Sequence, residues 1–141
     1  MVSYLIDTNA LSELKKRQPH PAVEQWFAAR PAASLGLSVL TLGELRKGIE
    51  AMAAGARKTS FLDWLENDIP RYFTGRILPV DRRIAERWGH LCATAGRPLP
   101  AIDSLLAATA LEHGLTLVTR NLGDFEFPGL VVINPWNDAQ G

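Results

Sequence analysis

The sequence predicts an α/β protein in which a mostly parallel central sheet is flanked by helices, a three-layer sandwich. Short apolar or β-branched runs typical of strands alternate along the chain with longer segments whose apolar residues recur at helical spacing. Parallel strands need crossover helices, and right-handed crossovers place those helices on both faces of a sheet. No internal repeat or Pro/Gly-rich linker divides the 141 residues. We therefore expect a single domain, residues 1–141.

The expected strands and helices follow one another in alternation. The apolar runs predict strands at residues 1–6, 34–39, 77–80, 115–119 and 130–133. Helical spacing predicts helices at residues 10–16, 42–52 and 58–72, with further helices after Pro21, after Asp81 and from Asp103 to Gly114.

Several helix ends have recognisable capping residues. The run Asp7-Thr8-Asn9 offers N-cap side chains before the first helix. Thr41, with Glu44 three residues later, fits a capping box. Asp81 is expected to cap the helix that follows it, and Gly114 suits the residue just after a helix end.

Composition and charge limit the class of protein. With 47% hydrophobic and 21% charged residues, the chain has the composition of a folded globular protein. The 15 Lys and Arg balance the 15 Asp and Glu, so nucleic-acid binding would need a local basic patch. The lone Cys92 excludes a disulfide framework, and the longest uncharged stretch, 31–43, is too short to span a membrane. No signal peptide is visible, and we expect a cytoplasmic protein.

Four acidic residues fall at one edge of the predicted sheet. Asp7 and Asp124 follow strands, Glu44 lies in the first turn of a helix, and Asp103 starts a helix. Ligands of α/β sheets bind at the carboxyl ends of the strands. Carboxylates gathered there repel one another unless cations neutralise them, and Mg²⁺ or Mn²⁺ prefers such oxygen ligands. This pattern favours metal-assisted phosphodiester hydrolysis.

Each acid also has a simpler structural explanation. Asp103 fits a helix N-cap, and Glu44 fits the far end of the capping box. Asp124 fits an ordinary Asx turn. Asp7 is the hardest to explain this way, because a carboxylate that abuts a buried strand needs a partner.

The neighbouring polar residues leave similar alternatives open. Thr8 and Thr119 could orient a metal-bound water or cap helices, and Asn121 could hold a carboxylate or form a turn. The basic run 15–17 and the pair 46–47 follow closely on Asp7 and Glu44. They could be solvated surface or a rim that binds phosphates.

The motifs, taken in order, resemble those of PIN-domain proteins. The matching segments are Ile6-Asp7-Thr8-Asn9, the run from Ser38 to Gly48, the run from Asp103 to Ala110, and the run from Leu117 to Phe125. The closing Ile133-Asn134-Pro135-Trp136 is similar to the ending of the VapC and FitB-like branch. The resemblance runs over nearly the whole chain at suitable spacing.

The resemblance implies a Mg²⁺- or Mn²⁺-dependent ribonuclease on a PIN-like fold. The family's acidic quartet falls on Asp7, Glu44, Asp103 and Asp124, which would be the metal-binding residues, with Asp7 and Asp103 in direct contact. Thr119 would be the accompanying hydroxyl and Asn121 would lie near the last acid.

The resemblance also implies partners. The chain would be the toxin of a toxin–antitoxin pair, a homodimer held by a small DNA-binding antitoxin of the VapB or FitA kind. DNA would be contacted only through that antitoxin. An amphipathic segment of such a partner needs an apolar groove, which the helices at 10–16 and 42–52 could supply.

Two other functions remain open from the residues. A phosphatase of the haloacid dehalogenase type needs a second Asp two residues after its nucleophile, where this chain has Asn9. A receiver-like domain would need an acidic pair near the first strand and a late Lys, where this chain has Arg120. A non-catalytic binding module on the same fold would be expected to have lost some of the four acids.

Overall fold

The computed structural model describes residues 1–137, so the last four residues of the predicted domain 1–141 lie outside the described part. Within residues 1–137 a five-stranded sheet has the order β3-β2-β1-β4-β5, and each strand pairs in parallel with its neighbour. The strands are β1 (Tyr4–Ile6), β2 (Leu35–Ser38), β3 (Ile77–Leu78), β4 (Thr116–Val118) and β5 (Val132–Ile133). The sheet is thus parallel throughout, and β1 is central.

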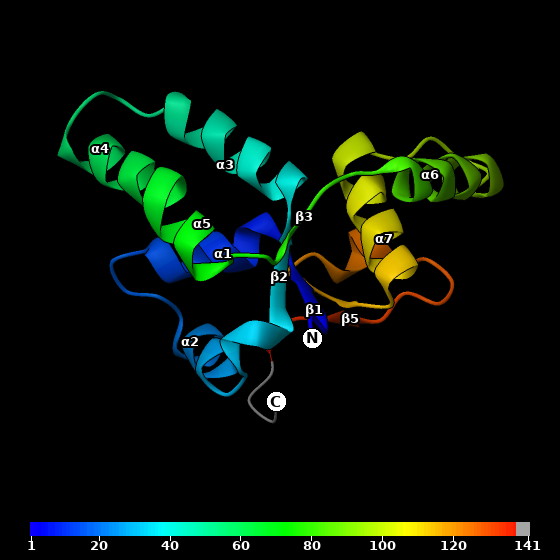
Figure 1. Cartoon of the computed structure of the whole chain (residues 1–141), viewed down its shortest axis with the longest axis horizontal. Helices are drawn as coiled ribbons and strands as arrows, with labels where there is room; N and C mark the ends of the chain where they lie inside the picture. Colours follow the sequence, from blue (N-terminus) through cyan, green and yellow to red (C-terminus); the bar gives the residue numbers. More distant parts are fainter. Residues whose placement is uncertain (138–141) are drawn as a thin grey trace.

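Helices cover both faces of this sheet and complete the predicted three-layer sandwich. They are α1 (Thr8–Lys15), α2 (Pro21–Ala28), α3 (Val39–Glu50), α4 (Ala56–Asp63), α5 (Ile69–Tyr72), α6 (Arg82–Thr94) and α7 (Ala101–His113). Short helical turns occupy Ala32–Ser34, Trp64–Asp68 and Leu122–Phe125. Figure 1 shows α1 to α5 on one side of the sheet and α6 and α7 on the other. None of the helices in residues 1–137 is long and apolar enough to cross a membrane.

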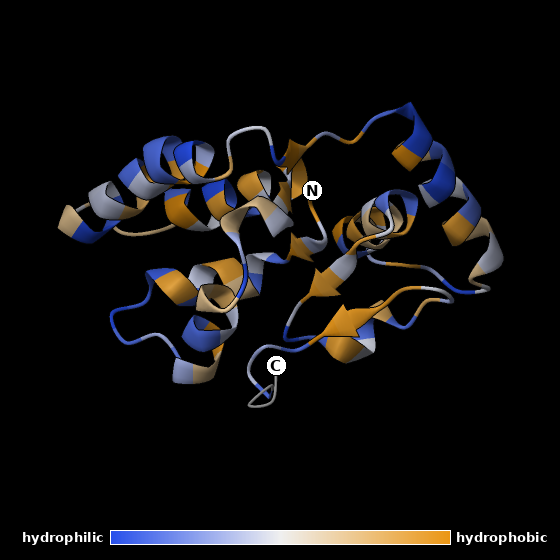
Figure 2. Ribbon diagram, turned by 60° about the horizontal axis from the view of Figure 1, so that its bottom comes forward, coloured by the Kyte–Doolittle hydropathy of each residue, from blue (hydrophilic) through white to orange (hydrophobic). Residues whose placement is uncertain are grey.

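Each face of the sheet has its own apolar core. Successive residues of a strand point to opposite faces, so Ile6 and Leu5 enter different cores. Ile6 packs with Val118 under α1 to α5, whereas Leu5 packs with Leu117 under α7. Figure 2 shows hydrophobic strands at the centre and hydrophilic residues mainly on the outer helices.

Two of the predicted helix ends are confirmed. The Asp81 carboxylate accepts a hydrogen bond from the backbone N–H of Ile84 at 3.0 Å, as expected of an N-cap. Gly114 ends α7 with a φ of 66°, in the left-handed region that favours glycine.

Two other capping predictions are wrong. Helix α3 begins earlier than the pattern predicts, at Val39, because the Ser38 side chain accepts the N–H of Leu40. Thr41 and Glu44 therefore lie inside the helix and form no capping box. Helix α7 likewise begins at Ala101, which places Asp103 within its first turn rather than at its cap. Both carboxylates are consequently free for other contacts.

The segment predicted as one helix at 58–72 is divided in three. Helix α4 passes into a π-helical turn, Trp64–Asp68, in which the N–H of Ile69 donates to the carbonyl of Trp64. Pro70 follows in α5 and has no N–H to donate. The regular pattern of hydrogen bonds is therefore interrupted at this point.

Candidate functional site

The four acidic residues lie at the carboxyl edge of the sheet, as predicted from their positions. Asp7 directly follows the central strand β1, and Asp124 lies in the helical turn after β4. Glu44 is on α3, which follows β2, and Asp103 is in the first turn of α7. The four carboxylates come from separate segments and are close enough to influence one another electrostatically.

Asp7 is the most enclosed of the four, with 6% of its surface exposed. Its carboxylate accepts hydrogen bonds from the Thr8 N–H at 2.8 Å and from the Thr119 hydroxyl at 2.7 Å. Burial raises the pKa of Asp7, those two hydrogen bonds oppose the rise, and the charges of Glu44 and Asp124 add to it. The carboxylate is held in a fixed orientation that leaves its negative charge only partly stabilised.

Thr119 is the buried centre of a small polar network. Its oxygen also accepts hydrogen bonds from the Asn9 side-chain amide at 3.2 Å and from the backbone N–H of Asn121 at 3.1 Å. The Asn9 carbonyl oxygen in turn accepts the N–H of Arg120 at 3.2 Å. The network fixes the loop after β4 against the start of α1.

Asn9 is a contributor that sequence reasoning did not assign to the site. Besides Thr119, its amide lies 3.5 Å from the Asp7 carboxylate. Its position in the run Asp7-Thr8-Asn9, directly after a buried strand, was the signal that could have identified it.

Glu44 is held by a contact with α1. The Thr8 hydroxyl donates to its carboxylate at 2.5 Å, which links α1 to α3 across 36 positions of sequence. This contact corresponds to neither of the two roles left open for Thr8, orienting a metal-bound water or capping a helix, because its hydroxyl positions a carboxylate instead. Thr8 therefore bridges Asp7, through its N–H, and Glu44, through its hydroxyl.

Asp103 and Asp124 complete the acidic face without fixed partners. Asp103 is half-buried, and its pKa is raised by burial and then by the charges of Asp7, Asp124 and Glu44. Neither Asp103 nor Asp124 accepts a side-chain hydrogen bond within residues 1–137. Asn121 takes part through its backbone, because its side chain forms no hydrogen bond with these acids in the described part of the chain.

The donor set fits a hard divalent cation. In residues 1–137 no Lys or Arg forms an ion pair with any of the four acids, so their mutual repulsion is not relieved within the chain. The same residues contain no group of three His, Cys, Asp or Glu side chains placed to hold an ion between them. Mg²⁺ is commonly held by one or two carboxylates, with water and substrate phosphate completing its shell. An open acidic face of this kind suits that mode of binding.

Two hollows are lined in part by α1, and the first of them reaches the acidic face. The first, of about 730 Å³, begins at Thr8 and Glu44 and runs between α1 and α3 toward Arg57 and Phe61. This is the groove predicted between the two helices. The second, of about 510 Å³, is lined among others by Leu11, Leu14, Phe27, Trp64 and Phe73, and both hollows have mainly apolar walls.

Comparison with known proteins shows to which family the chain is similar. The PIN domain profile matches residues 4–126. The chain is 41% identical to a VapC ribonuclease, Y4jK, of Sinorhizobium fredii, over 96% of this chain and 99% of that protein. It is 36% identical to toxin FitB of Neisseria gonorrhoeae, over 95% of this chain and 99% of that one.

Solved structures show the same fold. The FitAcB crystal structure from Neisseria gonorrhoeae superposes with a TM-score of 0.86 at 36% identity, covering 95% of this chain and 99% of that chain. A DNA-bound VapBC structure from Salmonella typhimurium superposes with a TM-score of 0.73 at 26% identity, covering 96% and 99%.

Proposed function

Because this chain belongs to the PIN-domain family, and within it to the VapC and FitB toxins, we propose that it is a metal-dependent endoribonuclease acting as the toxin of a toxin–antitoxin pair. The observation that carries the proposal is the acidic face. Asp7, Glu44, Asp103 and Asp124 lie at one edge of the sheet, with raised pKa values at Asp7 and Asp103 and no cation paired to any of them in residues 1–137.

The residues divide into two roles. Asp7, Glu44, Asp103 and Asp124 would form the acidic site for Mg²⁺ or Mn²⁺, with Asp7 and Asp103 in direct contact and water and substrate phosphate completing its shell. When bound, the metal would activate water and stabilise the leaving oxygen of the cleaved phosphodiester. Thr8, Asn9 and Thr119 orient the carboxylates of Asp7 and Glu44 through the hydrogen bonds described above. Asn121 supports Thr119 through its backbone N–H.

Phosphoryl transfer through an acidic pair at the first strand is disfavoured by Asn9. That side chain occupies the position where a phosphatase of the haloacid dehalogenase type needs a second acid, and its amide is engaged by Thr119 and Asp7. All four acids are present and share one face, which favours an enzyme over a non-catalytic binding module.

The partner we propose is a small DNA-binding antitoxin of the VapB or FitA kind. The sequence placed its amphipathic segment in the groove between α1 and α3. We place it instead in the apolar hollow lined by Leu11, Leu14 and Phe27, because the α1–α3 groove opens at Thr8 and Glu44, beside the proposed cleavage site. The acidic face would attract an Arg or Lys of that partner in place of the metal. With a net charge of zero, this chain would contact DNA only through the antitoxin.

Two further properties belong to the proposal. The protein would act in the cytoplasm, where its RNA substrate and the DNA bound by its partner are found. It would also form a homodimer, and light scattering that shows a monomer at tens of micromolar would refute this.

The proposed function is tested with wild type and Asp7→Asn, purified without the antitoxin and incubated with RNA in Mg²⁺, Mn²⁺ or EDTA. We expect cleavage by wild type only with metal, and a loss of about 100-fold or more in Asp7→Asn, because one charge that stabilises the transition state is removed. Asp81→Asn is the matched control, since its carboxylate caps α6. Cleavage that survives EDTA, or equal rates for wild type and Asp7→Asn, would refute the assignment.

A further inference from the structure

Basic side chains gather at the far end of α1, away from the acidic face. They surround a hollow of about 400 Å³, here called the basic surface, which is lined by Lys15, Lys16, Arg17, Arg57, Ser60 and Phe61. The Lys15 ammonium donates to the Ser60 hydroxyl at 3.0 Å and lies 5.6 Å from the centre of the Phe61 ring. Arg57 lies over the same ring, also at 5.6 Å. Cations from α1 and α4 are therefore held together around one aromatic side chain.

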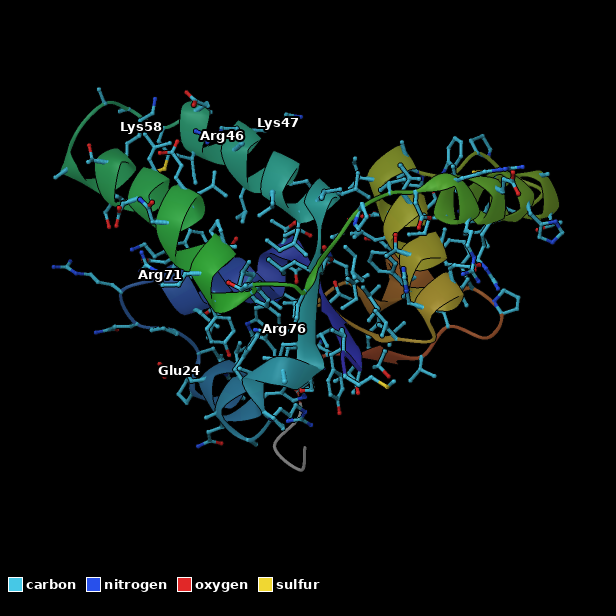
Figure 3. The ribbon with its side chains drawn as sticks, in the orientation of Figure 1. Glu24, Arg46, Lys47, Lys58, Arg71 and Arg76 are labelled. Carbon is cyan, nitrogen blue, oxygen red and sulfur yellow. The ribbon has the colours of Figure 1, made fainter. Side chains whose placement is uncertain are left out.

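Three of these cations are available for a ligand. Within residues 1–137, Lys15, Arg17 and Arg57 form no ion pair, whereas Lys16 is paired with Glu13 at 2.8 Å. The other basic positions singled out in the sequence differ in this respect. Arg46 is bound to Glu50 and Glu66, and it lies near Lys58 in Figure 3. At the expected phosphate-binding rim at 46–47, Arg46 is thus occupied by neighbouring acids, while Lys47 forms no ion pair in residues 1–137. In the same residues, the rim at 15–17 keeps two cations without an ion pair, Lys15 and Arg17.

The basic surface and the acidic face are joined by a continuous hollow. Arg57 and Phe61 line both the basic surface and the groove that begins at Thr8 and Glu44. Helix α1 runs along this path, and the rise of an α-helix puts Lys15 about 10 Å beyond Thr8. Cations at that distance are too far from the acids to share the scissile phosphate. They are placed instead to meet phosphates farther along the same strand.

We propose that single-stranded RNA lies in this groove, with its cleaved phosphodiester at Glu44 and Thr8 and its following phosphates at Lys15, Arg17 and Arg57. The inference rests on the proposed ribonuclease function and extends it to the path of the substrate. Charge complementarity selects the occupant, because unpaired cations lie at one end and a metal-binding acidic face lies at the other. In a chain with zero net charge, this local cluster supplies the electrostatic attraction that RNA binding requires.

The test measures RNA affinity in the Asp7→Asn background, so that binding is observed separately from cleavage. A labelled 12-nucleotide single strand is titrated at several salt concentrations with this protein and with a triple variant, Lys15→Gln, Arg17→Gln and Arg57→Gln. Each phosphate contact contributes about 0.7 to the slope of log affinity against log salt for single strands. We expect the triple variant to lose about 2 from that slope and about 100-fold in affinity at 0.1 M salt.

A matched control removes the same number of charges elsewhere. The control variant combines Arg82→Gln, Arg83→Gln and Arg97→Gln. Two of these positions lie on α6 and the third follows it, on the opposite side of the sheet (Figure 1). We expect this control to keep the slope of the parent protein. The single variant Arg57→Gln, which changes one exposed side chain, should lose about 0.7 from the slope and guards against misfolding of the triple variant.

Cleavage by proteins that retain Asp7 supplies the second measurement. The basic variant should raise KM for the 12-nucleotide RNA with little change in kcat, and should cleave a dinucleotide as wild type does. Equal salt slopes for the basic variant and its parent would overturn the inference. Normal RNA binding with loss of antitoxin binding would also overturn it and would assign the surface to the partner protein. If wild type cleaves no RNA while the slope difference persists, the nuclease function fails and the RNA path is supported.

Discussion

Replacing Thr119 with Val tests whether its buried hydroxyl stabilises the ionised form of Asp7. The side chain is fully buried and donates to the Asp7 carboxylate at 2.7 Å, while Val preserves its volume. Hydrogen bonds to charged groups contribute about 1.5–3 kcal/mol. The donors on Asn9 and Asn121 lose an acceptor but are reachable by water, so their contribution is small. We expect a loss of about 2 kcal/mol, equivalent to a fall of roughly 4–8 °C in Tm for a chain of this size.

The loss of stability in Thr119→Val should depend on pH. The Thr119 hydrogen bond lowers the pKa of Asp7, so the variant should have a still higher Asp7 pKa than wild type. The difference in unfolding free energy is then complete above both pKa values and shrinks as pH falls through them. Because oriented carboxylates also bind metal, cleavage should fall by about 10- to 100-fold.

The assay is thermal and chemical unfolding of the metal-free protein at pH 4 and pH 7.5, together with RNA cleavage at pH 7.5. The control is Thr109→Val, another buried threonine, whose hydroxyl donates to the Leu105 carbonyl within α7. This control should show a stability change that does not depend on pH. A Thr119→Val penalty that is equal at both pH values would refute the reasoning.

Three further predictions follow from the same structure. Asp103→Asn should flatten the pH dependence of stability in the metal-free protein, because the raised pKa of Asp103 stabilises the fold below about pH 4 and this stabilisation is lost as pH rises. Mg²⁺ should restore stability to wild type at pH 7.5. Equal profiles of Tm against pH for wild type and the variant would contradict this. Asp81→Asn should cost roughly 1 kcal/mol or less in denaturant unfolding and leave cleavage unchanged, and a larger loss would show that Asp81 does more than cap α6. Thr41→Val should raise stability by about 1 kcal/mol or more, because the Thr41 hydroxyl is buried without a hydrogen-bond partner in residues 1–137; a destabilised variant would indicate a water-mediated partner.

The positions of the acidic residues could be predicted because they depend on chain order alone. A carboxylate that follows a strand of a parallel sheet lies at its carboxyl edge whatever the surrounding side chains are. Asp7, directly after β1, and Asp124, after β4, lie at this edge for that reason. The N-cap at Asp81 and the helix end at Gly114 were equally local, because each depends on residues within one helical turn.

Local patterns failed where one residue had two competing roles. Thr41 and Glu44 satisfy the spacing of a capping box, yet Ser38 caps α3 and the chain enters the helix three residues earlier. Glu44 then accepts a hydrogen bond from Thr8, a residue 36 positions away. Asp103 fits the pattern of a helix N-cap, yet α7 begins at Ala101. The Asp103 carboxylate is therefore not used as a cap and is influenced by the charges of the other acids.

By itself, the sequence determined the alternation of strands and helices, the edge of the sheet where the acids lie, and the motifs shared with PIN-domain proteins. Only the tertiary structure decided which side chains meet there. The Thr119–Asp7 hydrogen bond joins residues 112 positions apart, and Arg57 on α4 comes beside Lys15 on α1 only through packing. Secondary structure follows from interactions within a few residues, whereas the orientation, pairing and desolvation of a charge depend on every segment packed around it.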